Sequence, residues 1–220
     1  MNIQNITLIA SAHEEMGELN SNTLYEILVG INPEIIFEEL PFPRIKENIL
    51  KFNINSIESH AIDKYIESYN ITHVSVDYDF SYILEEINCT YRILYDIIGN
   101  DEKIKMLNLK KNFSIGRYGF KYLNSNDCLC IIEQIKSIEK DIIINRNDKG
   151  LTCLFCLLEK INKKREYEMV KNIFEYSSKN DYNDAVFIFG IAHKKSIFEI
   201  IEDIKNKYKV NIKWKLYVSE

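Results

Sequence analysis

Proline and glycine are scarce in this sequence, with 3 Pro and 7 Gly among 220 residues. Because no Pro-, Gly- or Ser-rich linker divides the chain, we predict a single domain over residues 1–220. Long apolar runs are also missing. The longest, Leu151 to Leu158 and Ala185 to Ala192, are far too short to span a bilayer. With no Lys/Arg-led signal region at the start, the sequence predicts a cytoplasmic protein with no membrane partner.

Neither the net charge nor the spacing of the cysteines indicates a nucleic-acid-binding protein, a disulfide scaffold or a zinc site. The formal net charge is −5, so no global basic field is available to hold a nucleic-acid backbone, and we predict no nucleic-acid partner. The five cysteines are odd in number and lack framework spacing, which favours reduced thiols. The C-x-C at Cys128 and the C-x-x-C at Cys153 are not followed by further soft ligands. We interpret them as small buried apolar residues of helices rather than zinc ligands.

Short β-rich runs alternate along the chain with segments of helical periodicity. Several runs are apolar on both faces, which is typical of parallel strands covered by helices. We therefore predict a three-layer α/β fold with a mainly parallel central sheet and helices on both faces. The predicted strands are Ile6 to Ala12, Glu34 to Leu40, Thr72 to Phe80, Ala185 to Ile191 and Val210 to Val218; the predicted helices begin near Thr23, Ser56, Gly150 and Ser196.

Two parts of this outline carry separate expectations. The last strand alternates well between apolar and polar residues, so we expect it at an edge of the sheet, where an antiparallel orientation is an option. Residues 82–147 are mostly helical in pattern, and we predict a helical insertion or lid there. Within it, "GRYG" at Gly116 to Gly119 is interpreted as a basic turn in a solvated loop rather than a phosphate-binding loop.

Ionisable side chains stand where the predicted strands end. The carboxyl ends of parallel strands meet at one edge of a sheet, which is where ligand sites form in open α/β folds. Imidazoles and carboxylates gathered there could bind a divalent metal or act as a general acid–base pair. The alternative is that each histidine is a satisfied surface or core residue. The residues concerned are His13, Glu38, Glu39, Asp77, Asp79 and His193.

The two ends of the chain resemble a known superfamily. The segments are "LIASAHEEMGELNSNTLYEILVGINPEIIFEEL" and "KKREYEMVKNIFEYSSKNDYNDAVFIFGIAHKKSI". They are similar to the group that unites the TraB and pheromone-shutdown proteins, the Tiki proteases, the erythromycin-esterase-like enzymes and the ChaN-like haem-binding lipoproteins. That group is marked by two G-x-x-H motifs with a Glu-Leu strand end between them and an arginine in a late helix. Here Ala10 replaces the first glycine, and a need for positive φ at that position would distort the site.

The resemblance implies a role for each matching residue. His13 and His193 correspond to the paired histidines, Glu39 to the strand-end glutamate and Arg165 to the helix arginine. Together these four would form the catalytic group. A further set would bind substrate: Asp77, which lies where several members have an aspartate, Glu38 as a second carboxylate, and Arg44, which resembles the arginine after Glu-Leu in the TraB branch.

The function expected from this group is hydrolysis of an ester or peptide bond in a small-molecule or peptide substrate. His13 and Glu39 would activate water, either directly or through a divalent ion (Mn, Co or Zn) bound by His13, Glu39 and His193. Arg165 would stabilise an oxyanion or orient Glu39 by a bidentate salt bridge. The alternative is a non-catalytic binding or regulatory protein on the same fold, and a generic α/β protein is a third. A homo-oligomer is compatible with each.

Overall fold

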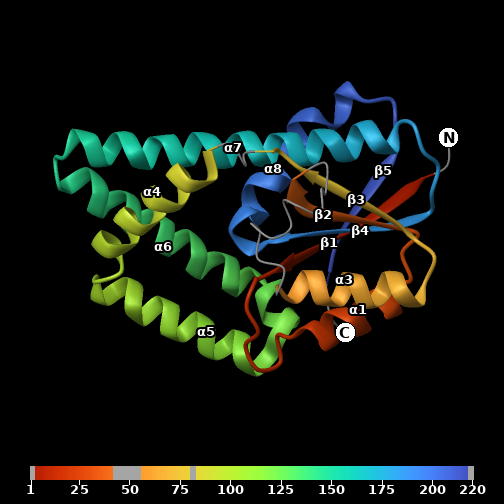
Figure 1. Cartoon of the computed structure of the whole chain (residues 1–220), viewed down its shortest axis with the longest axis horizontal. Helices are drawn as coiled ribbons and strands as arrows, with labels where there is room; N and C mark the ends of the chain where they lie inside the picture. The colour runs from red at the N-terminus through yellow and green to blue at the C-terminus, as the bar shows by residue number, and fades with distance from the viewer. Residues whose placement is uncertain (1–2, 42–55, 80–82, 218–220) are drawn as a thin grey trace.

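A five-stranded sheet, parallel throughout, forms the centre of the molecule in the computed structural model, which describes residues 3–41, 56–79 and 83–217 (Figure 1). The strand order is β3-β2-β4-β1-β5. The two central strands, β1 and β4, are buried on both faces, which explains their continuous apolar sequences. The strands are β1 (Gln4–Ser11), β2 (Ile35–Pro41), β3 (Thr72–Asp77), β4 (Asp184–Gly190) and β5 (Ile212–Leu216).

The last strand, β5, lies at an edge as predicted, but it is not antiparallel. It pairs with β1 in parallel, in a register that runs from Gln4 opposite Ile212 to Leu8 opposite Leu216. The reason is the helix between β4 and β5. This helix returns the chain to the amino end of the sheet, so the next strand runs in the same direction as the one before. The alternation of apolar and polar residues indicates that one face of the strand is exposed to solvent, but it carries no information on strand direction.

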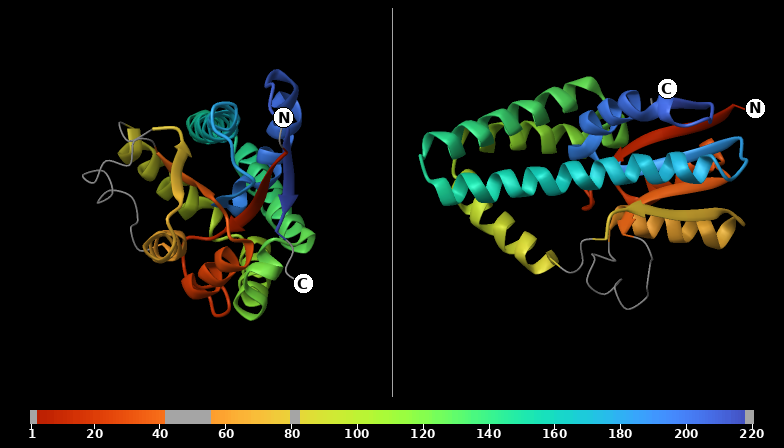
Figure 2. Two further views of the ribbon diagram at one scale, coloured as in Figure 1. Left: turned by 90° about the vertical axis from the view of Figure 1, so that its right-hand side faces the viewer. Right: turned by 90° about the horizontal axis from the view of Figure 1, so that it is seen from above.

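Helices cover both faces of the sheet, which confirms the three-layer fold (Figures 1 and 2). On one face, α7 (Lys149–Ser177) and α8 (Lys194–Ile204) pack on residues such as Leu8 and Phe187. On the other, α1 (Ser21–Ile31) and α3 (Ile57–Ser68) pack on the opposite side chains of the same strands. The first helix begins two residues earlier than predicted, because Asn20 rather than Thr23 is its cap and accepts from the Thr23 N–H at 2.9 Å.

The middle of the chain forms a helical layer beyond the carboxyl ends of the strands (Figure 1). It consists of α4 (Leu84–Ile98), α5 (Glu102–Leu123) and α6 (Asn126–Asn145), and the first half of α7 joins it. These helices share their own apolar cluster, which includes Leu94, Ile104 and Leu158. None of the helices in the described ranges is long and apolar enough to cross a membrane.

The "GRYG" segment is not a solvated loop. It lies inside α5, where Gly119 (φ 54°) forms a kink against the loop that follows β1. The Glu18 N–H donates a hydrogen bond to the Gly116 carbonyl at 2.9 Å. A Cβ on Gly119 would stand 2.7 Å from the Glu18 carbonyl oxygen, so only glycine allows this close approach. The glycines therefore serve to dock one backbone on another.

The cysteines are all free thiols, but only one is an apolar core residue. Cys128 is buried in the cluster beneath α1 and α3, and burial raises the pKa of its thiol to about 11. Cys130, Cys153 and Cys156 are exposed, so their predicted burial is wrong. Their helices present a wet face at these positions, which short C-x-C and C-x-x-C spacings cannot reveal.

Candidate active site at the carboxyl edge of the sheet

His193 lies immediately after β4, in the short 3-10 turn Ile191–His193, and two carboxylates flank its ring. Its Nδ1 is 2.6 Å from Oε1 of Glu166 on α7, and its Nε2 is 3.3 Å from Oε1 of Glu39 at the end of β2. The His193 side chain is 12% exposed and both carboxylates are 8% exposed. The strand ends and α7 thus enclose an imidazole between two buried acids.

Glu39 is joined in turn to Arg165 and Asp77. Nη2 of Arg165 donates to Glu39 Oε1 at 2.7 Å, while its Nε and Nη2 donate to Asp77 Oδ2 at 3.0 and 2.7 Å. The backbone N–H of Gly190 donates to Glu39 Oε2 at 2.7 Å. The structure therefore brings together four of the predicted residues, Asp77, Arg165, Glu39 and His193. The Arg165 guanidinium, however, binds Asp77 through two nitrogens and Glu39 through a single hydrogen bond.

The charges around His193 and Glu39 determine the protonation states of these two residues. Burial lowers the pKa of His193, but the charge of Glu39 and the hydrogen bond to Glu166 outweigh it and raise the pKa to about 9. Burial raises the pKa of Glu39, yet His193 and Arg165 together hold it well below the usual range of a carboxyl. At neutral pH the pair is consequently an imidazolium and a carboxylate. His193 in this state can donate a proton or stabilise negative charge, and it cannot accept a proton.

His13 lies at the same edge but on its rim, with a side chain that is 65% exposed. It pairs with Glu58 of α3, with Nδ1 3.6 Å from Oε1, whereas the expected function pairs it with Glu39. The interaction with Glu58 raises the pKa of His13, burial opposes it, and the charges of Glu39 and His193 act with opposite signs. His13 is therefore coupled electrically to the buried pair while its ring remains open to water.

Glu58 is a residue that the sequence did not single out. Its side chain is 8% exposed, and within the described residues neither carboxylate oxygen has a hydrogen-bond partner; the buried Ser11 Oγ at the end of β1 is in the same condition. Glu58 sits in the first turn of α3, where the helix dipole favours negative charge. In the sequence it looks like an ordinary first-turn acid after the cap Ser56, which is why it was missed.

Glu166 and Ser196 extend the group on the far side of His193. Oε2 of Glu166 accepts a hydrogen bond from Ser196 Oγ at 2.5 Å. The sequence contained a signal for this carboxylate: the buried positions of α7 include Leu158, Glu166, Met169 and Ile173, so Glu166 stands in an otherwise apolar stripe. A charged residue at such a position needs a buried partner, and His193 is that partner.

The remaining predicted residues do not join the group. Glu38 points to the opposite face of β2 from Glu39, since neighbouring residues of a strand alternate. There its Oε2 is 2.6 Å from Nε2 of His73 on β3, so this carboxylate belongs to a pair between two strands. Arg44 lies outside the described residues. Ala10 sits within β1 and its φ is not positive, so the backbone does not require the glycine of the motif.

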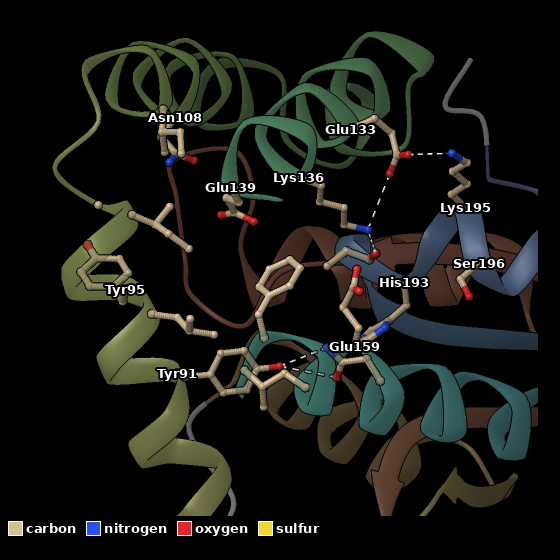
Figure 3. A pocket seen from close by; sticks show the side chains of 18 of the residues that line it. Tyr91, Tyr95, Asn108, Glu133, Lys136, Glu139, Glu159, His193, Lys195 and Ser196 are labelled. Atoms are coloured by element: carbon tan, nitrogen blue, oxygen red, sulfur yellow. Dashed lines mark hydrogen bonds and ion pairs between the residues drawn. The ribbon is translucent and has the colours of Figure 1, made fainter. Parts of the chain in front are cut away.

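A cavity of about 910 Å³ opens between the helical layer and α8, and the buried group forms part of its wall (Figure 3). His193, Glu166 and Ser196 line one end, while side chains of α4, α5, α6 and α7 line most of the rest. Its volume lies within the range of small-molecule sites. His13, Glu39 and Arg165 are not part of the lining, so the contents of the cavity meet this group through His193.

The predicted metal ligands do not form a metal site. Within the described ranges, no group of three or more His, Cys, Asp or Glu side chains is placed to hold an ion. The chemistry of the donors explains this. Both oxygens of Glu39 are bound, one by the Arg165 guanidinium and one by the Gly190 N–H, so a cation already occupies the position that a metal would need. We therefore derive no chemical step through a metal.

Comparisons of the chain with protein-family models, with curated proteins and with solved structures find no match. The similarity to the TraB, Tiki and erythromycin-esterase-like superfamily thus remains an expectation from the motif residues. The chemistry of the site has to be argued from its own geometry.

Proposed function

We propose that this protein is a hydrolase that cleaves an ester or peptide bond at the carboxyl edge of the sheet. One observation carries the proposal: a buried imidazolium, His193, forms the wall of a large cavity, while a second imidazole, His13, stands exposed to water at the same edge. A proton donor and a proton acceptor kept apart by their surroundings are the parts that acyl transfer to water requires.

In the proposed reaction, neutral His13 takes a proton from water as the water oxygen attacks the carbonyl carbon. Glu58 orients the His13 ring and stabilises the imidazolium that forms. His193 then gives its Nε2 proton to the leaving oxygen or nitrogen as the carbon–heteroatom bond breaks. Glu39 remains ionised throughout, and the two histidines exchange protons with solvent to complete the cycle.

Arg165 and Asp77 are positioning residues in this scheme. The guanidinium is 15% exposed and is bound by two carboxylates, so it is poorly placed to receive an oxyanion. Its role is to hold Glu39 beneath His193. The metal-assisted version of the reaction is the less supported one, because the same guanidinium competes with any cation at Glu39.

A non-catalytic binding or regulatory protein is the second candidate, and one observation favours it. Both nitrogens of His193 and both oxygens of Glu39 already have protein partners. A site saturated in this way could hold a small molecule or peptide in the cavity without turning it over. It predicts thermal stabilisation by the ligand and no product.

Hydrolysis assays on panels of nitrophenyl esters and peptides test the proposal. The protein is purified without a histidine tag, and His13→Ala and His193→Gln are compared with His60→Ala, an exposed histidine of α3 that does not line the cavity. The first two variants should lose about 100-fold or more in kcat/KM, and the third should keep its rate. Equal rates for all three would refute the assignment. Chelator, Mn²⁺, Co²⁺ and Zn²⁺ are each expected to leave the rate unchanged, and a response would restore the metal version.

A further inference from the structure

The cavity beside His193 has an apolar and aromatic lining over most of its length. Leu94 and Ile98 of α4, Ile104 of α5 and Phe155 of α7 supply hydrocarbon and ring surface, and Tyr91 and Tyr95 stand at its outer wall (Figure 3). Tyr95 is 75% exposed and Tyr91 is 45% exposed, so these rings are accessible from outside. A ligand that fits here must carry an apolar body.

The charges in the lining are not balanced by one another. Glu133 is paired, with Lys195 at 2.8 Å and Lys136 at 3.6 Å, and Lys136 also donates to the Ala192 carbonyl. Glu139, by contrast, points into the cavity, and it forms no hydrogen bond or ion pair within the described part of the chain (Figure 3). Burial raises the pKa of Glu139, and the opposing charges of Lys136 and Lys111 do not offset this effect.

Little positive charge is left for an anionic ligand. Lys136 and Lys195 both pair with Glu133, and Lys105 pairs with Glu102 at 2.8 Å. His193 is held between two carboxylates, and Lys163 is exposed to solvent. Three lining carboxylates, Glu139, Glu159 and Glu199, have no ion pair among the described residues, against one lining lysine, Lys163, so the unpaired charge of the lining is negative.

We propose that this cavity binds an organic cation with an apolar body, such as a hydrophobic amine in its ammonium form. The ammonium lies near Glu139 and the faces of Tyr91 and Tyr95, where a carboxylate and aromatic rings both favour positive charge. The apolar body packs along α4, α5 and α7 toward His193. The inference deepens the proposed function, on which it rests for one point only: the ligand is the substrate, and its ester or amide group reaches His193.

Isothermal titration of the full chain with matched probes tests this. We compare n-octylammonium, n-octanoate and n-octanol, which share the alkyl chain and differ in head-group charge. Octylammonium should bind about tenfold or more tightly than octanoate, because a carboxylate beside Glu139 is repelled. Glu139→Gln should remove this preference. Glu26→Gln, an exposed glutamate on α1 on the other side of the sheet, should retain it.

A second pair of variants keeps the test independent of Glu139. Leu109 lines the cavity and is 71% exposed, whereas Met106 on the same helix is 69% exposed and does not line it. Leu109→Arg places a positive charge at the mouth and should weaken octylammonium binding, while Met106→Arg should not. Octanoate binding as tightly as octylammonium, no binding of any probe, or indifference to both Glu139→Gln and Leu109→Arg would each overturn the inference.

The two proposals fail in different ways. Octylammonium binding with the expected variant effects, but no hydrolysis of any ester or peptide, would remove the hydrolase and leave the cation site. Hydrolysis that depends on His13 and His193 but shows no preference for cationic over anionic substrates would remove the cation site and leave the hydrolase.

Discussion

Oε1 of Glu166 lies 2.6 Å from Nδ1 of His193, so an acid of α7 fixes the ring that closes β4. Glu39 lies at the other nitrogen, so each nitrogen of the imidazole faces a carboxylate. The protonated ring can donate to both carboxylates at once, whereas the neutral ring can donate to only one of them. The folded structure therefore stabilises the protonated form of His193.

Stability should therefore decline in alkaline solution. The folded pKa of His193 is about 9, above its ordinary value of 6.5. The resulting stabilisation, about 3 kcal/mol, is fully present below pH 6.5 and is lost as pH rises through about 9. Urea unfolding at several pH values measures it. In Glu166→Gln, NMR titration should show a lower pKa for His193, and the alkaline decline should begin earlier. An unchanged titration would contradict the assigned network.

Removing Arg165 should be costly, because two buried carboxylates would lose their shared cation. Arg165→Gln is expected to lower the free energy of unfolding by about 3–5 kcal/mol. Adding Asp77→Asn should recover part of this loss, since one uncompensated charge is then removed. Lys171→Gln, which breaks a more exposed ion pair with Glu168 on the same helix, should cost less than about 1 kcal/mol. Equal losses for the two single variants would show that Arg165 is not buried in a charge network.

Glu58 should control the titration of His13. Glu58→Gln removes the carboxylate 3.6 Å from Nδ1, and we expect the pKa of His13 to fall toward 6.5. NMR titration of the His13 ring measures the change. If hydrolysis is observed, the acid limb of its pH–rate profile should shift to lower pH by the same amount. A His13 titration indifferent to Glu58→Gln would disprove the pairing.

Two glycine substitutions should have opposite signs. Gly119→Ala introduces a Cβ at φ 54° and 2.7 Å from a backbone oxygen, so it should destabilise by more than about 1 kcal/mol. Gly30→Ala lies in α1 with nothing within 4 Å of the new Cβ, and it should stabilise by about 0.5–1 kcal/mol. Thermal and urea unfolding of both variants provide the measurement. Similar effects of the two would contradict the docked kink in α5.

The sequence could predict the strand ends at which this group is built. His193, Glu39 and Asp77 directly follow or close apolar runs, and parallel strands bring such ends to one edge whatever the details of packing. The sequence alone does not decide whether Glu38 or Glu39 joins this group. Adjacent residues of a strand face opposite ways, and only the position of α7 decides which face receives Arg165.

Site residues on helices are harder to predict from the sequence than site residues at strand ends. Glu166 and Glu58 act through the face of the helix on which they stand, and that face is defined by tertiary packing. The same limit applies to β5, where alternation indicates exposure and carries no information on direction. Cys153 and Cys156 show the converse error, because apolar neighbours in the sequence suggested a buried face that the long helix turns toward water.

The loop after β1 is fastened to α5 through main-chain atoms. Glu18 donates to the Gly116 carbonyl, and a Cβ on Gly17 would stand 2.3 Å from that oxygen, so no side chain separates the two segments. The same helix supplies Leu109 to the cavity wall, and the same loop carries His13. Any shift of α5 would therefore have to be accommodated by the loop that carries His13.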